Sequence, residues 1–191
     1  MKVKLLFTLI VLFGFGVSSW AQENKETEWI KVYFNMPGDS SVMQGVNISN
    51  DSWDLISTLE NLIDSADFSV DLAIYDIEEM RVAEALARAK ARGVRVRIVT
   101  DNHNRTDAGI LDEKIWEAFR KADITSIDDD GDVYLPNGEI LDNDLVNDEA
   151  DMHHKFALID ALSENKNDDY VWKRSTNLTY TGAYNTNNTI V

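Results

Sequence analysis

Hydrophobic and polar positions along the chain predict strands and helices in turn. Apolar residues recur at every second position in the expected strands, and at every third or fourth position in the expected helices. The expected strands cover residues 29–34, 68–75 and 94–99, with a short one near Ile124. The expected helices cover residues 51–66, 80–92 and 111–121. Because strands and helices alternate at short spacing, the pattern predicts an α/β sheet with helices packed on its faces.

Residues at the ends of these elements agree with this division. Asp51 or Ser52 can cap the first helix, and Gly93 follows the second helix as a stop signal. Asn137-Gly138 predicts a hairpin turn within the acidic segment 128–151. The apolar face of the first helix is expected to contain Trp53, Ile56, Leu59 and Ile63.

The first 21 residues differ from the rest of the chain. Lys2 and Lys4 precede the apolar run 5–17, and Ser19 and Ala21 are small residues at the −3 and −1 positions of a cleavage site. This pattern predicts a signal peptide over residues 1–21 and a secreted or periplasmic protein that begins at residue 22. A retained membrane anchor is the alternative.

Composition limits the classes of partner. The chain has 191 residues, 44% of them hydrophobic, which suits one domain with a single core. The absence of cysteine excludes a disulfide framework and a cysteine-ligated metal site. A net charge of −16 disfavours nucleic acid as a partner. The basic residues between Arg88 and Arg97 are interpreted as a solvated face.

The segment 150–161 carries the strongest chemical signal. Within it His153, Lys155 and Asp160 fall at the spacing H-x-K-x4-D, and the apolar run 156–159 is typical of a buried strand. His153 and Lys155 are two residues apart, so they share one side of an extended backbone. An imidazole and an ammonium in this arrangement suit attack on a phosphoryl group. The alternative is an exposed polar turn that leads into a core strand.

A second polar segment, Ser175-Thr176-Asn177, follows some fifteen residues after Asp160. With both motifs in this order, the chain resembles the phospholipase D superfamily, whose signature is HxKxxxxD followed by G-S-x-N. Residues 70–101 are also similar to the family's strand, helix and strand ahead of the motif. The resemblance covers residues 29–191, so residues 22–191 form one phospholipase D-like domain with one HxKxxxxD motif. It implies a mixed β-sheet flanked by helices on both faces.

The resemblance also implies roles for single residues. His153 matches the histidine that attacks phosphorus and forms a phosphohistidine, and Lys155 matches the lysine that binds phosphate oxygens. Asp160 matches the aspartate of the catalytic motif. Ser175 and Asn177 match the residues that help to hold the phosphate. This scheme requires no metal and no cofactor.

Three departures from the family pattern affect the expected activity. Arg174 stands where the family has glycine, which predicts impairment if that position needs a positive φ or a close backbone approach. The chain carries one motif, whereas the family's active site uses two histidines, so a homodimer or a missing second half is expected to complete it. The sequence also ends at Val191, where the family pattern continues, so the C-terminal end is expected to be incomplete.

Two other histidines and one acidic segment are given structural interpretations. His154 points to the opposite side of the strand from His153, and His103 follows a strand end as a loop residue. Asp128, Asp130 and Asp132 match alternate positions of a calcium loop, but Val133 occupies the position that requires glycine. A solvated acidic segment is therefore favoured over a calcium site.

Together these observations predict an exported phosphoric diester hydrolase of phospholipase D type. Phospholipid head groups are favoured as its substrate because a polyanion would meet a strongly negative surface. One alternative is a homodimeric endonuclease of the same superfamily. The other is a catalytically impaired fragment or a binding module on the same fold, for which Arg174 and the early end of the sequence are the arguments.

Overall fold

A computed structural model describes residues 29–34, 54–103, 110–142, 151–179, 182 and 188–191. The predicted signal peptide therefore lies outside the described residues, as do Asp51, Ser52 and Trp53. The helices are α1 Leu55–Ser65, α2 Met80–Ala91 and α4 Ile110–Lys121. The strands are β1 Val32–Phe34, β2 Ser69–Ile74, β3 Arg95–Thr100, β4 Ser126–Asp128, β5 Val133–Tyr134, β6 Ile140–Leu141, β7 Lys155–Ile159, β8 Tyr170–Arg174 and β9 Asn188–Ile190.

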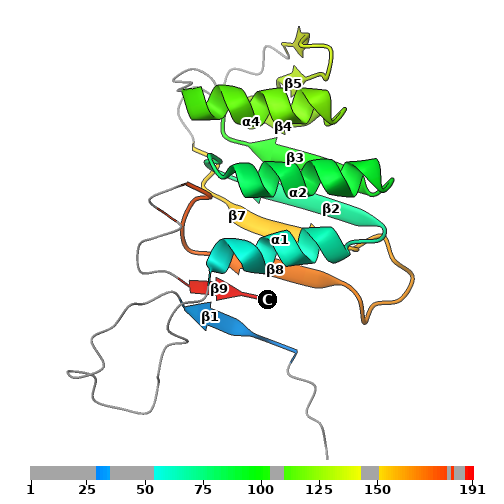
Figure 1. Cartoon of the computed structure of the whole chain (residues 1–191). Coiled ribbons are helices and arrows are strands. Elements are labelled where there is room, and N and C mark those ends of the chain that lie inside the picture. The colour runs from blue at the N-terminus through cyan, green and yellow to red at the C-terminus, as the bar shows by residue number, and fades with distance from the viewer. Residues whose placement is uncertain (1–28, 35–53, 104–109, 143–150, 180–181, 183–187) are drawn as a thin grey trace, which may run out of the picture.

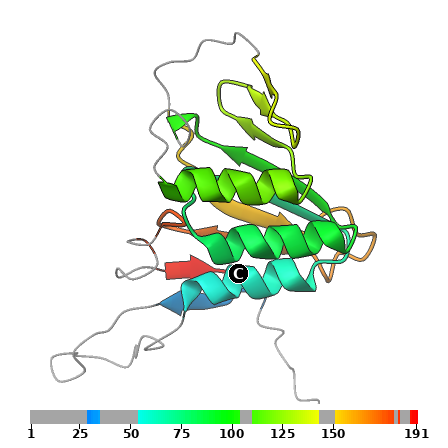
Figure 2. The ribbon, with the colours of Figure 1, turned by 45° about the horizontal axis from the view of Figure 1, so that its top comes forward.

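All of these strands form one mixed sheet, in the order β1-β9-β8-β7-β2-β3-β4-β5-β6. The pairs β2–β3 and β3–β4 are parallel, and the other pairs are antiparallel. The α/β class and the mixed sheet are thus confirmed. Figures 1 and 2 show α1, α2 and α4 side by side on one face of the sheet. Helices were expected on both faces of the sheet, but every helix in the described ranges covers the same face.

The core lies between the sheet and this helix layer. Ile56, Leu59 and Ile63 of α1 are buried, which confirms three of the four residues expected on its apolar face. Along β2 and β3 the burial alternates, so every second side chain points into the core. The opposite face carries exposed apolar side chains, among them Val99 and Ile127. The amphipathic patterns in the sequence therefore result from burial on a single side of the sheet.

Helix ends and turns follow local chemistry. Asp54 caps α1, because its carboxylate accepts hydrogen bonds from the backbone N–H groups of Ile56 and Ser57. Gly93 has φ +91° and follows Arg92, the C-cap of α2, which confirms the predicted stop. Gly138 has φ +86° between the antiparallel strands β5 and β6, so the predicted hairpin turn is confirmed as well.

The basic residues between Arg88 and Arg97 are paired with acids of the same chain. Arg88 binds Asp64 at 2.7 Å and Glu60 at 3.2 Å, so it joins α2 to α1. On the open face of the sheet, Arg95 and Arg97 both bind Asp71, at 3.0 and 2.7 Å. These contacts neutralise much of the local positive charge, as expected of a structural, solvated surface.

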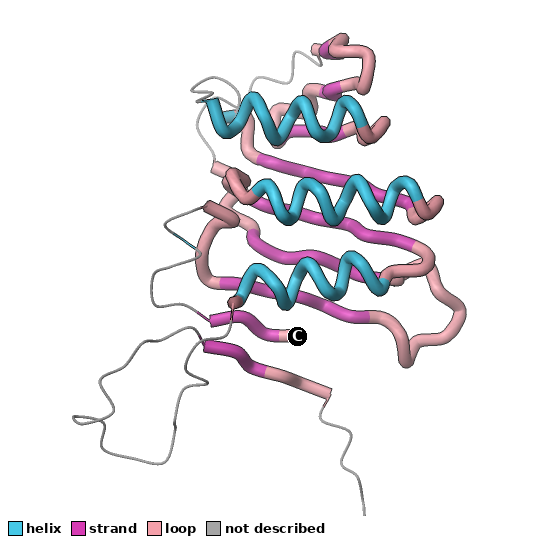
Figure 3. The backbone as a smooth tube through the Cα atoms, viewed as in Figure 1, coloured by secondary structure: helices cyan, strands magenta, loops and turns pink. Residues whose placement is uncertain are grey.

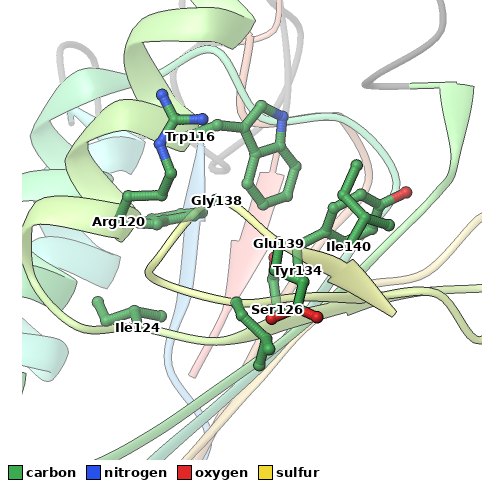
Figure 4. A pocket seen from close by; sticks show the side chains of 10 residues that line it. Trp116, Arg120, Ile124, Ser126, Tyr134, Gly138, Glu139 and Ile140 are labelled. Atoms are coloured by element: carbon green, nitrogen blue, oxygen red, sulfur yellow. The ribbon is translucent and has the colours of Figure 1, made fainter. Parts of the chain in front are cut away.

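A small pocket lies between α4 and the β5–β6 hairpin (Figure 4). Trp116, Arg120 and Tyr134 line it together with Ile124 and Ser126. Ser126 is the first residue of β4, Ile124 precedes that strand, and Tyr134 belongs to the neighbouring strand β5. The pocket therefore lies at the β4–β5–β6 side of the sheet, separated from β7 by β2 and β3.

Trp172→Phe is expected to destabilise the fold. The Trp172 side chain is fully buried, and its indole N–H donates to the hydroxyl of Thr58 at 3.0 Å, which joins β8 to α1. Loss of this bond and of ring volume should lower the free energy of unfolding by about 1–3 kcal/mol. Denaturant unfolding measures the change. Tyr170→Phe, at an exposed position of the same strand, is the control and should change stability by less than about 0.5 kcal/mol. If the two variants lose the same stability, the stabilising role assigned to the buried Trp172 side chain is wrong.

Candidate active site

Polar residues of the two sequence motifs lie at the edge of the sheet where β2, β3 and β8 end and β7 begins. Because β7 is antiparallel to β2 and to β8, the beginning of β7 lies beside the ends of β2 and β8. Lys155 is opposite Ile74, and Phe156 is opposite Lys173. β3 is parallel to β2, so its end reaches the same edge. This edge is on the left in Figures 1 and 3, where the segments that follow β2, β3 and β8 meet the segment that precedes β7.

His153 and Lys155 meet around the ring of Tyr75, the residue directly after β2. The Lys155 ammonium lies 5.0 Å from the centre of this ring and 3.4 Å from the carbonyl oxygen of His153. The His153 ring packs edge-on against the same ring, with the ring centres 4.9 Å apart. Lys155 is only 7% exposed, whereas His153 is exposed. An accessible imidazole therefore stands beside a largely buried cation.

The surroundings shift the protonation equilibria of this site. Burial lowers the pKa of Lys155, and the nearby Asp76 carboxylate only partly opposes that shift. Burial raises the pKa of Tyr75, with a further contribution from acids that include Asp151 and Asp101. A poorly hydrated ammonium gains most from an anionic ligand that restores its lost solvation. Lys155 is therefore suited to hold a phosphate oxygen.

Ser175 and Asn177 are brought to the same edge by backbone pairing. Leu178 forms an isolated parallel bridge with Ile77, and its backbone N–H donates to the carbonyl of Asp76 at 3.0 Å. The segment after β8 therefore lies beside the segment after β2. Ser175 is exposed, and the buried side-chain oxygen of Asn177 has no hydrogen-bond partner among the described residues. Both side chains thus belong to the edge that carries His153 and Lys155.

Asp160, the aspartate of the motif, lies at the opposite end of β7 from His153 and Lys155. Its carboxylate accepts hydrogen bonds of 2.7–3.1 Å from the backbone N–H groups of residues 67–69, at the beginning of β2. The whole length of β7 separates it from His153 and Lys155. These hydrogen bonds fix the end of β7 against the beginning of β2.

Arg174 does not strain the backbone at the position where the family has glycine. Among the described non-glycine residues only Asp123 and Asp160 have positive φ. The buried Arg174 guanidinium donates to the carbonyl of Gly182 at 2.5 Å, and burial lowers its pKa to about 10. The close backbone approach occurs at Gly182 instead, because a Cβ there would lie 2.4 Å from the carbonyl oxygen of Asn177. The reason for expecting impairment is therefore removed.

His103 and Asp101 also reach this edge, and sequence reasoning treated His103 as a loop residue. The His103 Nδ1 atom lies 2.7 Å from a carboxylate oxygen of Asp101, and its ring centre is 4.6 Å from that of Tyr75. The only signal in the sequence was the position of both residues after the end of a strand. His154 contacts Phe156 instead, with ring centres 5.9 Å apart, in keeping with its structural interpretation.

Comparison with known proteins agrees with the fold and the motifs. The family model described as "Cardiolipin synthase, PLD-like domain" matches residues 59–191. The chain therefore belongs to this phospholipase D-like family, within a superfamily of phosphodiesterases. A search of curated proteins gave no significant match. Within the described ranges, no helix has both the length and the apolar character needed to cross a membrane.

Two solved structures illustrate the likeness. The phospholipase D family member Nuc from Salmonella typhimurium is 21% identical, with a TM-score of 0.53 over 84% of this chain and 80% of that chain. NucT from Helicobacter pylori is 18% identical, with a TM-score of 0.48 over 84% of each chain. At this level of identity, the likeness to Nuc supports a shared fold.

Asp160→Ala is expected to destabilise the protein. Removal of the carboxylate leaves the N–H groups of residues 67–69 without their acceptor, which should lower the free energy of unfolding by about 2–4 kcal/mol. Denaturant unfolding tests this expectation. Glu164→Ala removes an exposed carboxylate a few residues later and should change stability by less than about 0.5 kcal/mol. If both variants are equally stable, the anchor assigned to Asp160 is wrong.

Proposed function

We propose that this protein hydrolyses phosphodiesters by way of a covalent phosphohistidine on His153. The observation that carries the proposal is the pairing of an exposed imidazole with the largely buried ammonium of Lys155 around Tyr75. Because Lys155 is largely buried, its ammonium favours an anionic partner such as a phosphate group. His153 contacts the same Tyr75 ring, so in this proposal it attacks the phosphorus of the phosphate that Lys155 binds. Membership of a phospholipase D-like family supports the same chemistry.

In the proposed reaction, a neutral ring nitrogen of His153 attacks phosphorus and displaces one alkoxide. Lys155 neutralises charge on the phosphate oxygens, and the side chains of Ser175 and Asn177 can donate hydrogen bonds to those oxygens. Water then attacks the phosphohistidine and releases the phosphate monoester. Division into two displacements lowers the barrier of each one. The scheme uses no metal.

Phospholipid head groups are the proposed substrate class. The family description refers to cardiolipin synthase, whose name denotes work on a phospholipid. The net charge of −16 disfavours a polyanionic nucleic acid, and the main basic cluster of the chain is already paired with acids. Export through a signal peptide at residues 1–21 is part of this proposal, and it rests on the sequence pattern of that segment.

A homodimeric endonuclease is the second candidate. The chain carries a single HxKxxxxD motif, so two chains related by a two-fold axis would bring two copies of His153 to one phosphate. The same pairing, or a second half of a longer protein, would also complete a lipid-specific site. A binding module without turnover is the third candidate. One argument for it was that Arg174 replaces a glycine, but Arg174 does not have a positive φ, so this argument is weakened.

The substrate class can be tested with His153→Gln. Phosphatidylcholine vesicles should release choline with the natural protein, and the variant should lose at least about a thousandfold in rate because the nucleophile is gone. His154→Gln is the matched control, since it changes the adjacent imidazole that packs on Phe156, and it should keep the natural rate. Plasmid nicking without choline release would favour the endonuclease. Turnover of neither substrate by the folded protein would contradict both enzymatic proposals.

Activity should fall on the alkaline side at a pH below the ordinary lysine pKa of 10.5. Burial favours the neutral amine of Lys155, so its ammonium is lost at a lower pH, and the phosphate contact is lost with it. The Tyr75 hydroxyl shifts the other way, above its ordinary pKa of 10.0. A pH profile of kcat/KM measures this alkaline loss of activity. Lys155→Arg should abolish the loss, because a guanidinium keeps its proton in this pH range. If the variant loses activity at the same alkaline pH as the natural protein, the role of Lys155 is contradicted.

A further inference from the structure

We propose that Arg174 and Lys155 form a pair of adjacent cations that makes this site prefer phosphate groups with two negative charges to those with one. The preference deepens the proposed function, on which it rests, by naming the charge of the group that the site binds best. Arg174 stands where the family has glycine, so the second cation does not come from the family motif. In the proposed reaction the favoured group is the phosphate monoester that hydrolysis releases.

Backbone pairing sets the two cations side by side. β7 and β8 are antiparallel, and Phe156 is opposite Lys173. Continuing this register by one residue brings Lys155, the first residue of β7, opposite Arg174, the last residue of β8. Residues directly opposite each other in an antiparallel pair have their Cβ atoms roughly 4.5–5.5 Å apart. The ammonium and the guanidinium therefore belong to the same end of one strand pair.

Both side chains also lie on the helix-covered side of the sheet. Side chains alternate along a strand, so Lys155 shares a side with Ala157, and by the same rule Arg174 lies on the side of its neighbour two residues back, Trp172. Ala157 and Trp172 are opposite each other and fully buried, and the Trp172 indole donates to Thr58 of α1. Lys155 is 7% exposed and Arg174 is 3% exposed, so two like charges are enclosed next to each other.

Neither cation has a carboxylate in ion-pair contact within the described ranges. Burial lowers the pKa of Lys155, and Asp76 only partly opposes this shift. Burial also lowers the pKa of Arg174 to about 10, although Asp54 and Glu79 favour its charged form. Two poorly solvated like charges destabilise each other, and an anion bound beside both of them would offset that cost.

Hydrogen-bond donors at this end of the strand pair are also left without acceptors. One nitrogen of Arg174 donates to the carbonyl of Gly182, but Nε and Nη1 are buried with no partner among the described residues. The same holds for the buried hydroxyls of Thr176 and Thr189, and Thr189 is opposite Arg174 on β9. Buried donors are normally satisfied, and an oxyanion can accept several hydrogen bonds at once. Ser175, the next residue, is exposed, so these donors lie directly beneath the accessible end of the site.

A second cation changes which phosphate is bound best. Coulomb attraction scales with the charge of the ligand, so each added cation strengthens the binding of a dianion more than that of a monoanion. Because Arg174 and Lys155 are both buried, salt and solvent screen this attraction less than they would at an exposed site. Removal of the Arg174 charge should therefore weaken the binding of a phosphate monoester more than the binding of a diester.

Binding of two small phosphates tests this pair without turnover. At about pH 7.5 methyl phosphate is largely a dianion, because the second pKa of a phosphate monoester is about 6, whereas dimethyl phosphate is a monoanion. Isothermal titration calorimetry on the natural protein should give a dissociation constant for methyl phosphate at least about tenfold below that for dimethyl phosphate. Arg174→Gln should reduce this ratio to less than about threefold, mainly by weakening the binding of methyl phosphate.

Two further variants separate loss of charge from loss of structure. Lys173→Gln is the matched control, because it removes the same charge from the adjacent, exposed residue on the other side of the sheet, and it should keep the ratio of the natural protein. Arg174→Lys keeps a cation at the buried position and should keep most of the preference for methyl phosphate. Circular dichroism shows whether each variant is folded.

The proposed pair is overturned if the natural protein binds the two phosphates equally or binds neither, a measurement that needs no variant. It is also overturned if folded Arg174→Gln weakens both by the same factor, or if Lys173→Gln loses the preference as well. Choline release is measured separately from binding. Choline release without a preference for methyl phosphate would contradict the cation pair alone, whereas that preference without hydrolysis of any phosphodiester would contradict the proposed function alone.

Discussion

The register of β7 against β2 is the constraint on which the site depends. Lys155 is opposite Ile74 at one end of the β7–β2 pair. At the other end, the Asp160 carboxylate accepts hydrogen bonds from three backbone N–H groups at the beginning of β2. Since side chains alternate along a strand, a slip of one residue would turn Lys155 from the helix-covered side to the open face of the sheet. The motif aspartate therefore fixes the register that determines to which side the motif lysine points.

Burial of one cation organises the rest of that edge. Lys155 is largely buried and its ammonium lies near the ring of Tyr75, so water cannot solvate the charge fully and an anionic ligand would be favoured. The ring of Tyr75 lies near this ammonium and near the imidazoles of His103 and His153. Asp101 joins the end of β3 to the segment before His153. Four strands thus contribute to one site, which explains why its members are scattered along the sequence.

Much of the fold could be predicted from local patterns. Ile56, Leu59 and Ile63 have helical spacing and are buried together, and Gly93 ends α2 as its position suggested. His153 and Lys155 were expected on one side of an extended backbone, and both contact the ring of Tyr75. The restriction of the described helices to one face of the sheet could not be predicted, because amphipathic patterns do not specify which face a helix covers.

Contacts between segments far apart in the sequence could not be predicted, because local patterns do not specify which strands pair. Tyr75 and His153 meet only because β7 inserts beside β2, and no local pattern encodes that choice. The spacing of the motif placed Asp160 near His153 in sequence, but an extended strand carries it to the other end of the sheet. Arg174 was judged by the glycine it replaces, whereas the close approach that needs glycine occurs at Gly182.

The most direct test of the account is the detection of a covalent intermediate on His153. The protein would be mixed with a phosphodiester substrate, quenched in alkali during the first turnover, and digested for mass spectrometry, because phosphohistidine survives base. The account predicts a phosphoryl adduct on His153 that disappears as turnover is completed. Turnover with an adduct on another residue, or with none at any time during the reaction, would contradict it.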